Sequence, residues 1–569
     1  MNPDVSARLL AWLFATTAFV APAFLHAAAT PVVEGPVVEL PKFEVKDSRL
    51  LPPPEKWLYA EVPGFEILSR ISERETKRFV RDFLLLQDVV TAIMPGIASA
   101  YTPVPTALIL CGRGDGFEEF LPRDRQVERY GTNSLFFKNA ERAAIVIDFA
   151  LPELQVDNDT RLESDPYRAF YAAYFRFLIR RQLGDKAPPW FEEGLVQLFA
   201  ATEFDKKHIT FGQIGDGFGA EKVGDFNRLL ARRALMPFRE MLAAKGPRSR
   251  SPFWAAQCYA FVHFSLYSHG QKYQKPFLQF VRRLENEEPT EQLFKECFNR
   301  TYSQFATELR GYVEFTAYKK TEFRAKKGQE LPEPPPVELR AAPDAHVGRI
   351  KGEVLRLGGY GDAARNVLIA PYVRGERDPR LLAAIGLDER EAGENERAQK
   401  FLEAAAGAKV DRARAYLELA RLRFSAAKSA PGAREGRLSE AQVSSVLGPL
   451  FTARSQRPPL ADVYRLIAET WALSVVPPLR EHLEVALQGV RLFPRDTALL
   501  MEVTLLAGKR GFPAEAAAVA KLGARVAQDA GERDRFQLLA GVYDPATPAA
   551  TKKDDDAPTP ETTKPYLLR

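Results

Sequence analysis

The pattern of hydrophobic and polar residues predicts that the folded part of the chain begins near Trp57. Residues 65–68, Phe-Glu-Ile-Leu, have the composition of a short strand. Residues 72–93 repeat apolar side chains every three or four positions, as an amphipathic helix does. Residues 106–111, Thr-Ala-Leu-Ile-Leu-Cys, form a continuous apolar run that indicates a buried strand. Strands and a helix therefore alternate at the start of this region.

The same region continues with a short helix at residues 115–120 and with two further strands at 134–137 and 144–148. From residue 165 to residue 315 the apolar spacing is helical. This order of elements is typical of an α/β or α+β domain. We expect an α+β fold, a small mixed sheet with helices.

A Pro-rich break at residues 331–337, Leu-Pro-Glu-Pro-Pro-Pro-Val, is the clearest boundary in the chain. The residues after it are rich in Ala, Leu and Arg and have helical spacing, whereas the last stretch has few apolar side chains, which predicts disorder. The predicted organisation is a signal peptide at 1–29, a Pro-rich leader at 30–56, the α+β domain at 57–325, a linker at 326–344, helical repeats at 345–542 and a disordered tail at 543–569.

Short helical pairs recur within residues 345–542. Gly361, Gly393 and Gly511 each stand at a turn that opens a second helix, and the first two are 32 positions apart. That spacing is close to the period of about 34 residues in tetratricopeptide repeats, which the region resembles in degenerate form. An insertion at residues 429–437 interrupts the period, and an irregular helical bundle is the alternative. The resemblance implies an all-α array with a concave face for a peptide or protein partner.

Composition limits the classes of function. The chain has 79 Lys and Arg against 74 Asp and Glu, a net charge of +5. This near balance argues against nucleic acid as a partner. Three cysteines are too few for a disulfide framework or a four-thiolate zinc site, and six histidines allow few metal ligands. Cys258 and Cys297 could pair in an oxidising compartment, but we favour three buried thiols.

The N-terminus has the features of a secretory signal peptide. Arg8 precedes an apolar run over residues 9–25, and Ala27-Ala-Ala follows it as a small-residue cleavage site. A single membrane anchor is the alternative, but Pro22 lies within the run. No later stretch has the roughly 18 continuous apolar residues that a membrane-spanning helix needs. We therefore expect the mature chain to contain no integral membrane segment and to be periplasmic or extracellular.

Residues 172–195 contain the most informative motif. It consists of Ala172-Ala173-Tyr-Phe-Arg176, then Gly184, then Pro189-Trp190-Phe-Glu-Glu193-Gly194-Leu. Over about residues 57–320 the chain resembles the gluzincin metallopeptidases, in particular the peptidase-MA-like group of exported bacterial proteins. Residues 256–264, which include His263, are similar to a later helix of that family. Members of the family bind zinc through two histidines of His-Glu-x-x-His on one helix and a Glu on the next.

The resemblance implies that this zinc site is degenerate. Ala172 stands at the first metal histidine, Ala173 at the general base and Arg176 at the second histidine, and Glu193 is the retained third ligand. Alanine has no donor atom, and arginine stays cationic. No histidine lies between Ala27 and Lys207 that could restore the motif in another register. We therefore expect no metal, no other cofactor and no catalytic residues.

The two charged positions suggest what replaces the metal. We hypothesise that Arg176 pairs with Glu193 and substitutes for zinc as a strut between two helices. The alternative is two unrelated surface charges, with Tyr174 and other aromatic residues on the inward face of the helix. Trp190 and His263, together with the two charged residues, are the tentative binding residues of the former cleft, although a lone histidine on an apolar helix is usually a core residue.

The sequence therefore predicts an exported, non-catalytic pseudopeptidase that binds a peptide or protein partner through its degenerate cleft, its repeats or both. One alternative is an active hydrolase with a catalytic set foreign to the family, one that includes Glu192, Glu193 or His263. The other is a purely structural repeat protein of the cell envelope.

Overall fold

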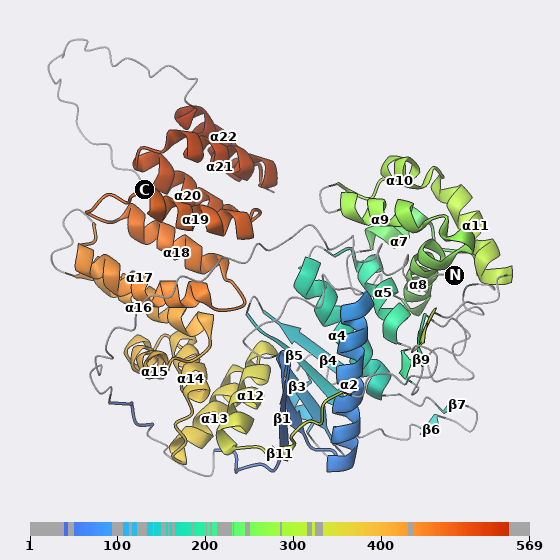
Figure 1. Ribbon diagram of the computed structural model, residues 1–569, viewed down its shortest axis with the longest axis horizontal. Helices are drawn as coiled ribbons and strands as arrows, with labels where there is room; N and C mark the ends of the chain where they lie inside the picture. The colour runs from blue at the N-terminus through green and yellow to red at the C-terminus, as the bar shows by residue number, and fades with distance from the viewer. Residues whose placement is uncertain are drawn as a thin grey trace, which may run out of the picture. The chain divides into compact units, whose positions relative to one another are not determined.

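The structure is a computed structural model, drawn in Figure 1. It describes residues 39–43, 51–93, 106–112, 116–121, 134–139, 141–149, 155–156, 160–161, 166–183, 187–200, 202–204, 208–212, 230, 233–244, 251–284, 287–315, 321–324, 334–430, 437–527 and 529–544. The chain divides into two compact units, residues 1–415 with 456–458 and residues 416–455 with 459–569. The predicted signal peptide and residues 545–569 of the predicted tail lie outside the described residues.

A mixed sheet organises the first unit. Its strands, in spatial order, are β11 (Arg340–Ala341), β1 (Leu58–Val62), β2 (Phe65–Ser69), β3 (Thr106–Cys111), β5 (Ala143–Asp148) and β4 (Ser134–Lys138). β2, β3 and β5 are parallel, and the outer pairings are antiparallel. The sequence predicts β2, β3, β4 and β5 to within one residue at each end. The α+β expectation is confirmed in this coarse form: a mixed sheet with helices precedes a long helical array.

Both faces of the sheet are covered by helices. Along β3, Leu108 and Leu110 join a hydrophobic core that includes side chains of α2 (Glu73–Ile93). Ala107 and Ile109 point the other way, because successive residues of a strand alternate between faces. They join a second core with α12 (Asp344–Leu357), and Figure 1 shows α2 and α12 on opposite sides of the sheet. Burial on both faces explains the continuous apolar run in β3.

The helices that follow the sheet form one aromatic-rich core with it. They are α4 (Pro166–Leu183), α5 (Pro189–Ala200), α7 (Phe238–Ala243), α8 (Pro252–Tyr267), α9 (Gln274–Arg283), α10 (Glu291–Phe298) and α11 (Tyr302–Phe315). Phe170 of α4, for example, contacts Phe79 and Phe83 of α2 with ring centroids 4.7 and 5.0 Å apart. Dense contact between rings fixes how the helices pack on the sheet.

The expectation of helices alone over residues 165–315 is wrong in one respect. Two short strands, β8 (Glu203–Phe204) and β9 (His208–Phe211), interrupt the helices and pair with each other, and β9 also pairs with β10 (Thr321–Arg324). Strands of two to four residues are too short to show a two-residue alternation, so their signal is lost in the sequence. A further pair, β6 (Gln155–Val156) and β7 (Thr160–Arg161), was missed for the same reason. The expected helix near residues 115–120 is a single 3-10 turn, η2 (Glu118–Phe120).

The helical array begins with α12 and continues through α13 (Gly361–Val373), α14 (Pro379–Glu391), α15 (Asn395–Gly407) and α16 (Ala413–Ser429). Alternate helices begin at a near-constant spacing: α12, α14 and α16 start 35 and 34 residues apart, and α13 and α15 start 34 apart. The second unit contains most of α16 and, after it, α17 (Glu440–Ser455), α18 (Ala461–Ala472), α19 (Arg480–Leu492), α20 (Thr497–Lys509), α21 (Pro513–Val526) and α22 (Ala530–Tyr543). None of the helices in the described parts of the chain combines the length and the apolar character needed to span a membrane.

The observed division differs from the boundary that the sequence suggests at residues 326–344. Within that stretch, β11 pairs with β1, and Val337 and Leu339 pack against the main core. Because α12 covers one face of the sheet, the first compact unit extends to Ala415. The Pro-rich composition indicates extended chain correctly, but it cannot show that this chain pairs with a strand.

Part of the predicted leader also belongs to the fold. Residues 39–43 lie against α13 and α15, where Phe43 contacts Tyr372 and Phe401. Arg374, just after α13, donates a hydrogen bond to the carbonyl of Pro52 at 2.9 Å. These contacts are within the first compact unit.

Candidate functional site

The motif that resembles the metallopeptidase site lies on α4 and α5. Ala172, Ala173 and Arg176 are on α4, and Glu193 is on α5, after a helix start set by Pro189. Gly194 lets α5 approach α8 closely: a Cβ atom added there would lie 2.4 Å from Val262 Cγ2. Across α4 and α5, Arg176 and Glu193 face each other.

The ion pair predicted between Arg176 and Glu193 is present. Arg176 Nη2 donates to Glu193 Oε2 at 2.8 Å, and its Nε donates to Glu192 Oε1 at 3.0 Å. Arg180 donates from two nitrogens to the two oxygens of Glu192, both at 2.8 Å. Gln197 donates to the other oxygen of Glu193 at 2.8 Å. Two arginines on α4 thus face two carboxylates on α5 in a partly buried ion cluster, defined as Arg176, Arg180, Glu192 and Glu193.

The aromatic inward face of α4 is present as well. Phe170, Tyr171, Tyr174 and Leu178 are buried, and Tyr167 is half-buried. The two interpretations of the helix are therefore compatible, since one face packs on the core and Arg176 projects toward α5. That the pair takes the place of a zinc ion stays a prediction.

The residues at this site do not fit a zinc ion. Ala172 is half-buried and Ala173 is buried, and neither carries a donor atom. Glu193 is the residue that the resemblance places at the third ligand position, and the Arg176 guanidinium lies against it. Over the described residues, no group of three or more His, Cys, Asp or Glu side chains is placed to hold a metal ion.

Trp190 does not line a surface. Its side chain is 1% exposed, and its ring packs against Phe191, Phe261 and Phe277 with centroids 5.1 to 6.1 Å away. The tentative assignment of Trp190 as a binding residue is therefore corrected: the tryptophan anchors α5 in the core. Its position next to Pro189 at the start of a helix gave no sign of this burial.

His263 is likewise a core residue. It is fully buried on α8, with Nδ1 2.8 Å from the Tyr312 hydroxyl and Nε2 2.9 Å from the Gly212 carbonyl. Because a carbonyl only accepts, Nε2 carries the proton, and Nδ1 of a neutral ring accepts from the hydroxyl. Both nitrogens are used within the fold, so His263 is not a binding residue. The three cysteines, Cys111, Cys258 and Cys297, are buried thiols, as favoured from the sequence.

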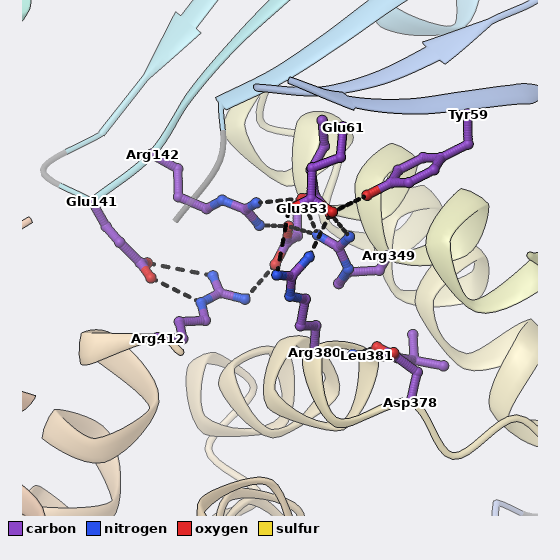
Figure 2. A network of polar contacts seen from close by, with 11 residues as sticks. Tyr59, Glu61, Glu141, Arg142, Arg349, Glu353, Asp378, Arg380, Leu381 and Arg412 are labelled. Atoms are coloured by element: carbon purple, nitrogen blue, oxygen red, sulfur yellow. Dashed lines mark hydrogen bonds and ion pairs between the residues drawn. The ribbon is translucent and has the colours of Figure 1, made fainter. Parts of the chain in front are cut away.

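A second cluster of charges, which the sequence did not predict, lies deeper in the first unit. Figure 2 shows this buried network, which connects strand β2, the residues before β5, helix α12, the start of α14 and the residue before α16. We define it as Glu66, Glu141, Arg142, Arg349, Glu353, Arg380 and Arg412.

Glu66 stands at the centre of the network. Arg349 Nη1 donates to Glu66 Oε2 at 2.8 Å, and Arg380 Nη1 donates to Oε1 at 3.1 Å. The Tyr59 hydroxyl donates to Oε1 at 3.2 Å. Burial by itself would raise the pKa of Glu66, but Arg349, Arg142 and Arg380 lower it to about 2. The carboxylate is therefore charged at any physiological pH.

The rest of the network is also paired. Glu353 contacts both Arg142 and Arg412, and Arg412 Nε donates to Glu141 Oε1 at 2.8 Å. Burial, together with the nearby charges of Arg412 and Arg349, lowers the pKa of Arg142 to about 9. Because each of these side chains faces one of opposite charge, the network can hold the elements of the first unit together.

One feature of the sequence pointed to this network. Glu66 interrupts the apolar strand Phe65-Glu66-Ile67-Leu68, and a buried charge requires a partner of opposite sign. Arg349 and Glu353, spaced by four on a helix, carry the complementary charges. Their separation from Glu66 by more than 280 residues leaves the pairing invisible in a single sequence.

Comparison with known proteins finds no matching family but does find a similar solved structure. No family model matches the sequence, and no curated protein does. A crystal structure of a thermophilic TPR protein from Thermus thermophilus is similar to 34% of this chain and to 96% of its own, at 17% sequence identity and a TM-score of 0.25.

Proposed function

We propose that the chain is an exported, non-catalytic scaffold: a gluzincin-like domain without its zinc site, followed by a tetratricopeptide-like array that binds a peptide or protein. Export is inferred from the signal-like residues 1–29. The binding role is inferred from the array, because stacked helical pairs present a continuous surface to a partner.

The observation that carries the non-catalytic half of this proposal is the ion cluster on α4 and α5. The guanidinium of Arg176 lies within 3.0 Å of both Glu192 and Glu193. A cation already placed at the retained carboxylate opposes the binding of a second cation there. The alanines at 172 and 173 supply neither a ligand nor a base.

The spacing of helices in the array supports the proposed binding role. Successive helical pairs in the first unit repeat at 34 to 35 residues, close to the period of about 34 in tetratricopeptide repeats. Glycines permit close helix contacts in the array: a Cβ at Gly352 would lie 2.5 Å from Leu368, and one at Gly386 would lie 2.9 Å from Leu402. Tight pairing of this kind fits a regular stack.

Restoration of the lost motif tests the metallopeptidase resemblance. We expect Ala172→His, Ala173→Glu and Arg176→His together to create a site for about one zinc ion per chain, since two histidines at i and i+4 would then face Glu193. Zinc content after dialysis, measured by mass spectrometry, is the readout. The wild-type chain should retain none and should not hydrolyse peptides.

The control is the same triple variant with Glu193→Gln, which should lose the metal. A triple variant that binds no more zinc than the wild-type chain would contradict the gluzincin-like geometry. Stoichiometric zinc with peptide hydrolysis in the wild-type chain would contradict the non-catalytic role. The binding half is tested by saturable capture of a partner from an envelope extract on the full chain, and the absence of any saturable partner would contradict it.

A further inference from the structure

A short segment of the chain itself, residues 39–43, contacts helices α13 and α15 of the array. The Phe43 ring lies edge-to-face with Tyr372 at a centroid distance of 5.6 Å and is stacked on Phe401 at 5.8 Å with an interplanar angle of 18°. The guanidinium carbon of Arg397 lies 4.4 Å from the centre of the same ring. Two rings and a cation therefore surround one aromatic side chain.

The groups that receive Phe43 are fixed by the fold. We call Tyr372, Phe401 and Arg397 the aromatic seat. Tyr372 and Phe401 are buried and contact each other at 5.3 Å. Arg397 is paired at 3.0 Å with Glu389, which is fully buried. A site whose side chains are held in place before binding loses little conformational entropy when it is filled.

The seat also contacts the peptide backbone. The Tyr372 hydroxyl donates a hydrogen bond to the carbonyl of Pro41 at 2.8 Å. Proline fixes its own φ angle and favours an extended conformation in the residue before it, Leu40. The segment is thus recognised through one aromatic side chain and one carbonyl two residues before it, and Phe43 itself stays half-buried.

We propose that the aromatic seat is a binding site for an extended peptide of the type Pro-x-aromatic, and that segment 39–43 occupies it until a partner peptide of the same chemistry displaces it. This inference rests on the proposed binding role of the array and names the class of partner. Because the occupant is tethered, its effective concentration is on the order of millimolar, and a partner must compete against that.

The test uses the full chain and a fluorescent peptide of residues 36–46, Pro-Val-Val-Glu-Leu-Pro-Lys-Phe-Glu-Val-Lys. With Phe43→Ala in the protein the seat is empty, so we expect the peptide to bind at least about tenfold more tightly than to the wild-type chain. The same peptide with its phenylalanine replaced by alanine should bind at least about tenfold more weakly. Fluorescence anisotropy measures both affinities.

Two variants of the protein separate this site from others. Arg397→Ala combined with Phe43→Ala should reduce the gain in affinity, because the cation over the ring is lost. Phe451→Ala, which changes a partly exposed aromatic residue on α17, should leave the affinity of the wild-type chain unchanged. Circular dichroism checks that each variant is folded.

A folded Phe43→Ala chain that binds the peptide no better than wild type overturns the proposal, and segment 39–43 is then ordinary packing. Should that variant unfold, fluorine NMR of the wild-type chain with fluorophenylalanine at position 43 decides. Peptide at millimolar concentration should give a second, displaced resonance, and an unchanged spectrum overturns the proposal. Saturable capture of a different envelope partner in either case leaves the general binding role standing.

Discussion

At the scale of single residues, the buried charge of Glu66 makes the stability of the first unit depend on pH. A carboxylate buried in a strand is unfavourable unless cations neutralise it, and Arg349, Arg142 and Arg380 do so here. Its pKa is lowered from 4.5 to about 2 in the folded chain. The contribution of this residue to stability is therefore complete above pH 4.5 and is lost as the pH falls toward 2.

We predict that Glu66→Gln destabilises the first unit by about 3 kcal/mol at neutral pH, because buried guanidinium groups lose their counter-charge. The variant should also lose less of its remaining stability than the wild-type chain between pH 4.5 and pH 2, since one carboxylate with a lowered pKa is gone. Urea midpoints at neutral pH, at 4.5 and at about 3 measure both effects.

Glu73→Gln is the matched control, because Glu73 is 61% exposed and its ion pair with Lys77 is screened by solvent. It should change neither the midpoint nor its pH dependence. A Glu66→Gln chain that keeps the acid sensitivity and the neutral-pH stability of the wild type would show that the network is not the source of either.

The sequence predicts local pairings better than distant ones. Arg176 and Glu193 lie 17 residues apart on consecutive helices, so counting along a motif places them together. The same counting does not indicate how deeply a side chain is buried. For this reason Trp190 and His263 are predicted near a cleft, whereas the structure places both in the core. Burial depends on α8 and α11, which no local pattern connects to these positions.

At the scale of elements, burial explains the clearest strand predictions, those of β2, β3 and β5. Burial is not the whole reason, because β4 was predicted although it is mostly half-buried, and β1 was not predicted although it is mostly buried. β3 and β5 are apolar at nearly every position because helices cover both their faces. β8, β9 and β11 were not predicted, because a strand of two to four residues is too short to show the alternation of apolar and polar residues. Such a strand is stabilised by pairing with a neighbouring strand, which a single sequence does not show. Helix spacing was predictable throughout the array for the opposite reason, because each helix is long enough to show its period.

The contact between α5 and α8 leads to a prediction about Gly194. A methyl group there would lie 2.4 Å from Val262 Cγ2 and 2.8 Å from the Cys258 carbonyl, so the helices must separate. We expect Gly194→Ala to destabilise the first unit by about 1 to 3 kcal/mol, despite the better helix propensity of alanine.

Gly311→Ala provides the comparison. Gly311 is also within a helix, α11, but a Cβ at that position has nothing within 4 Å. This variant should be neutral or more stable by about 0.5 to 1 kcal/mol. Thermal melting of the two variants measures the difference, and equal melting temperatures would contradict the close approach of α5 to α8.

At the scale of the whole molecule, the first helices of the array, α12 and α13, pack on the sheet within the first compact unit. The second core includes side chains from strands β1 to β5 and from η2 as well as from α12 and α13. The buried network adds charged contacts from Arg349 and Glu353 of α12 to the same sheet. The first helices of the array are thus a layer of the sheet domain, which the Pro-rich composition at 331–337 concealed.

This layering predicts where the chain can be shortened. A chain ending at residue 343 loses α12 and leaves Ile109, Val146 and neighbouring apolar side chains of the sheet open to water, together with Glu66 and Arg142. A chain ending at residue 429 keeps α12 to α16 and therefore keeps that face covered. We expect the longer chain to unfold cooperatively and the shorter one to aggregate or to bind the dye ANS without a cooperative transition. Circular dichroism melting and ANS fluorescence compare them under the same conditions.

A chain ending at 343 that melts cooperatively and at the temperature of the longer one would mean that the sheet folds without α12. The domain boundary would then lie at residues 326–344.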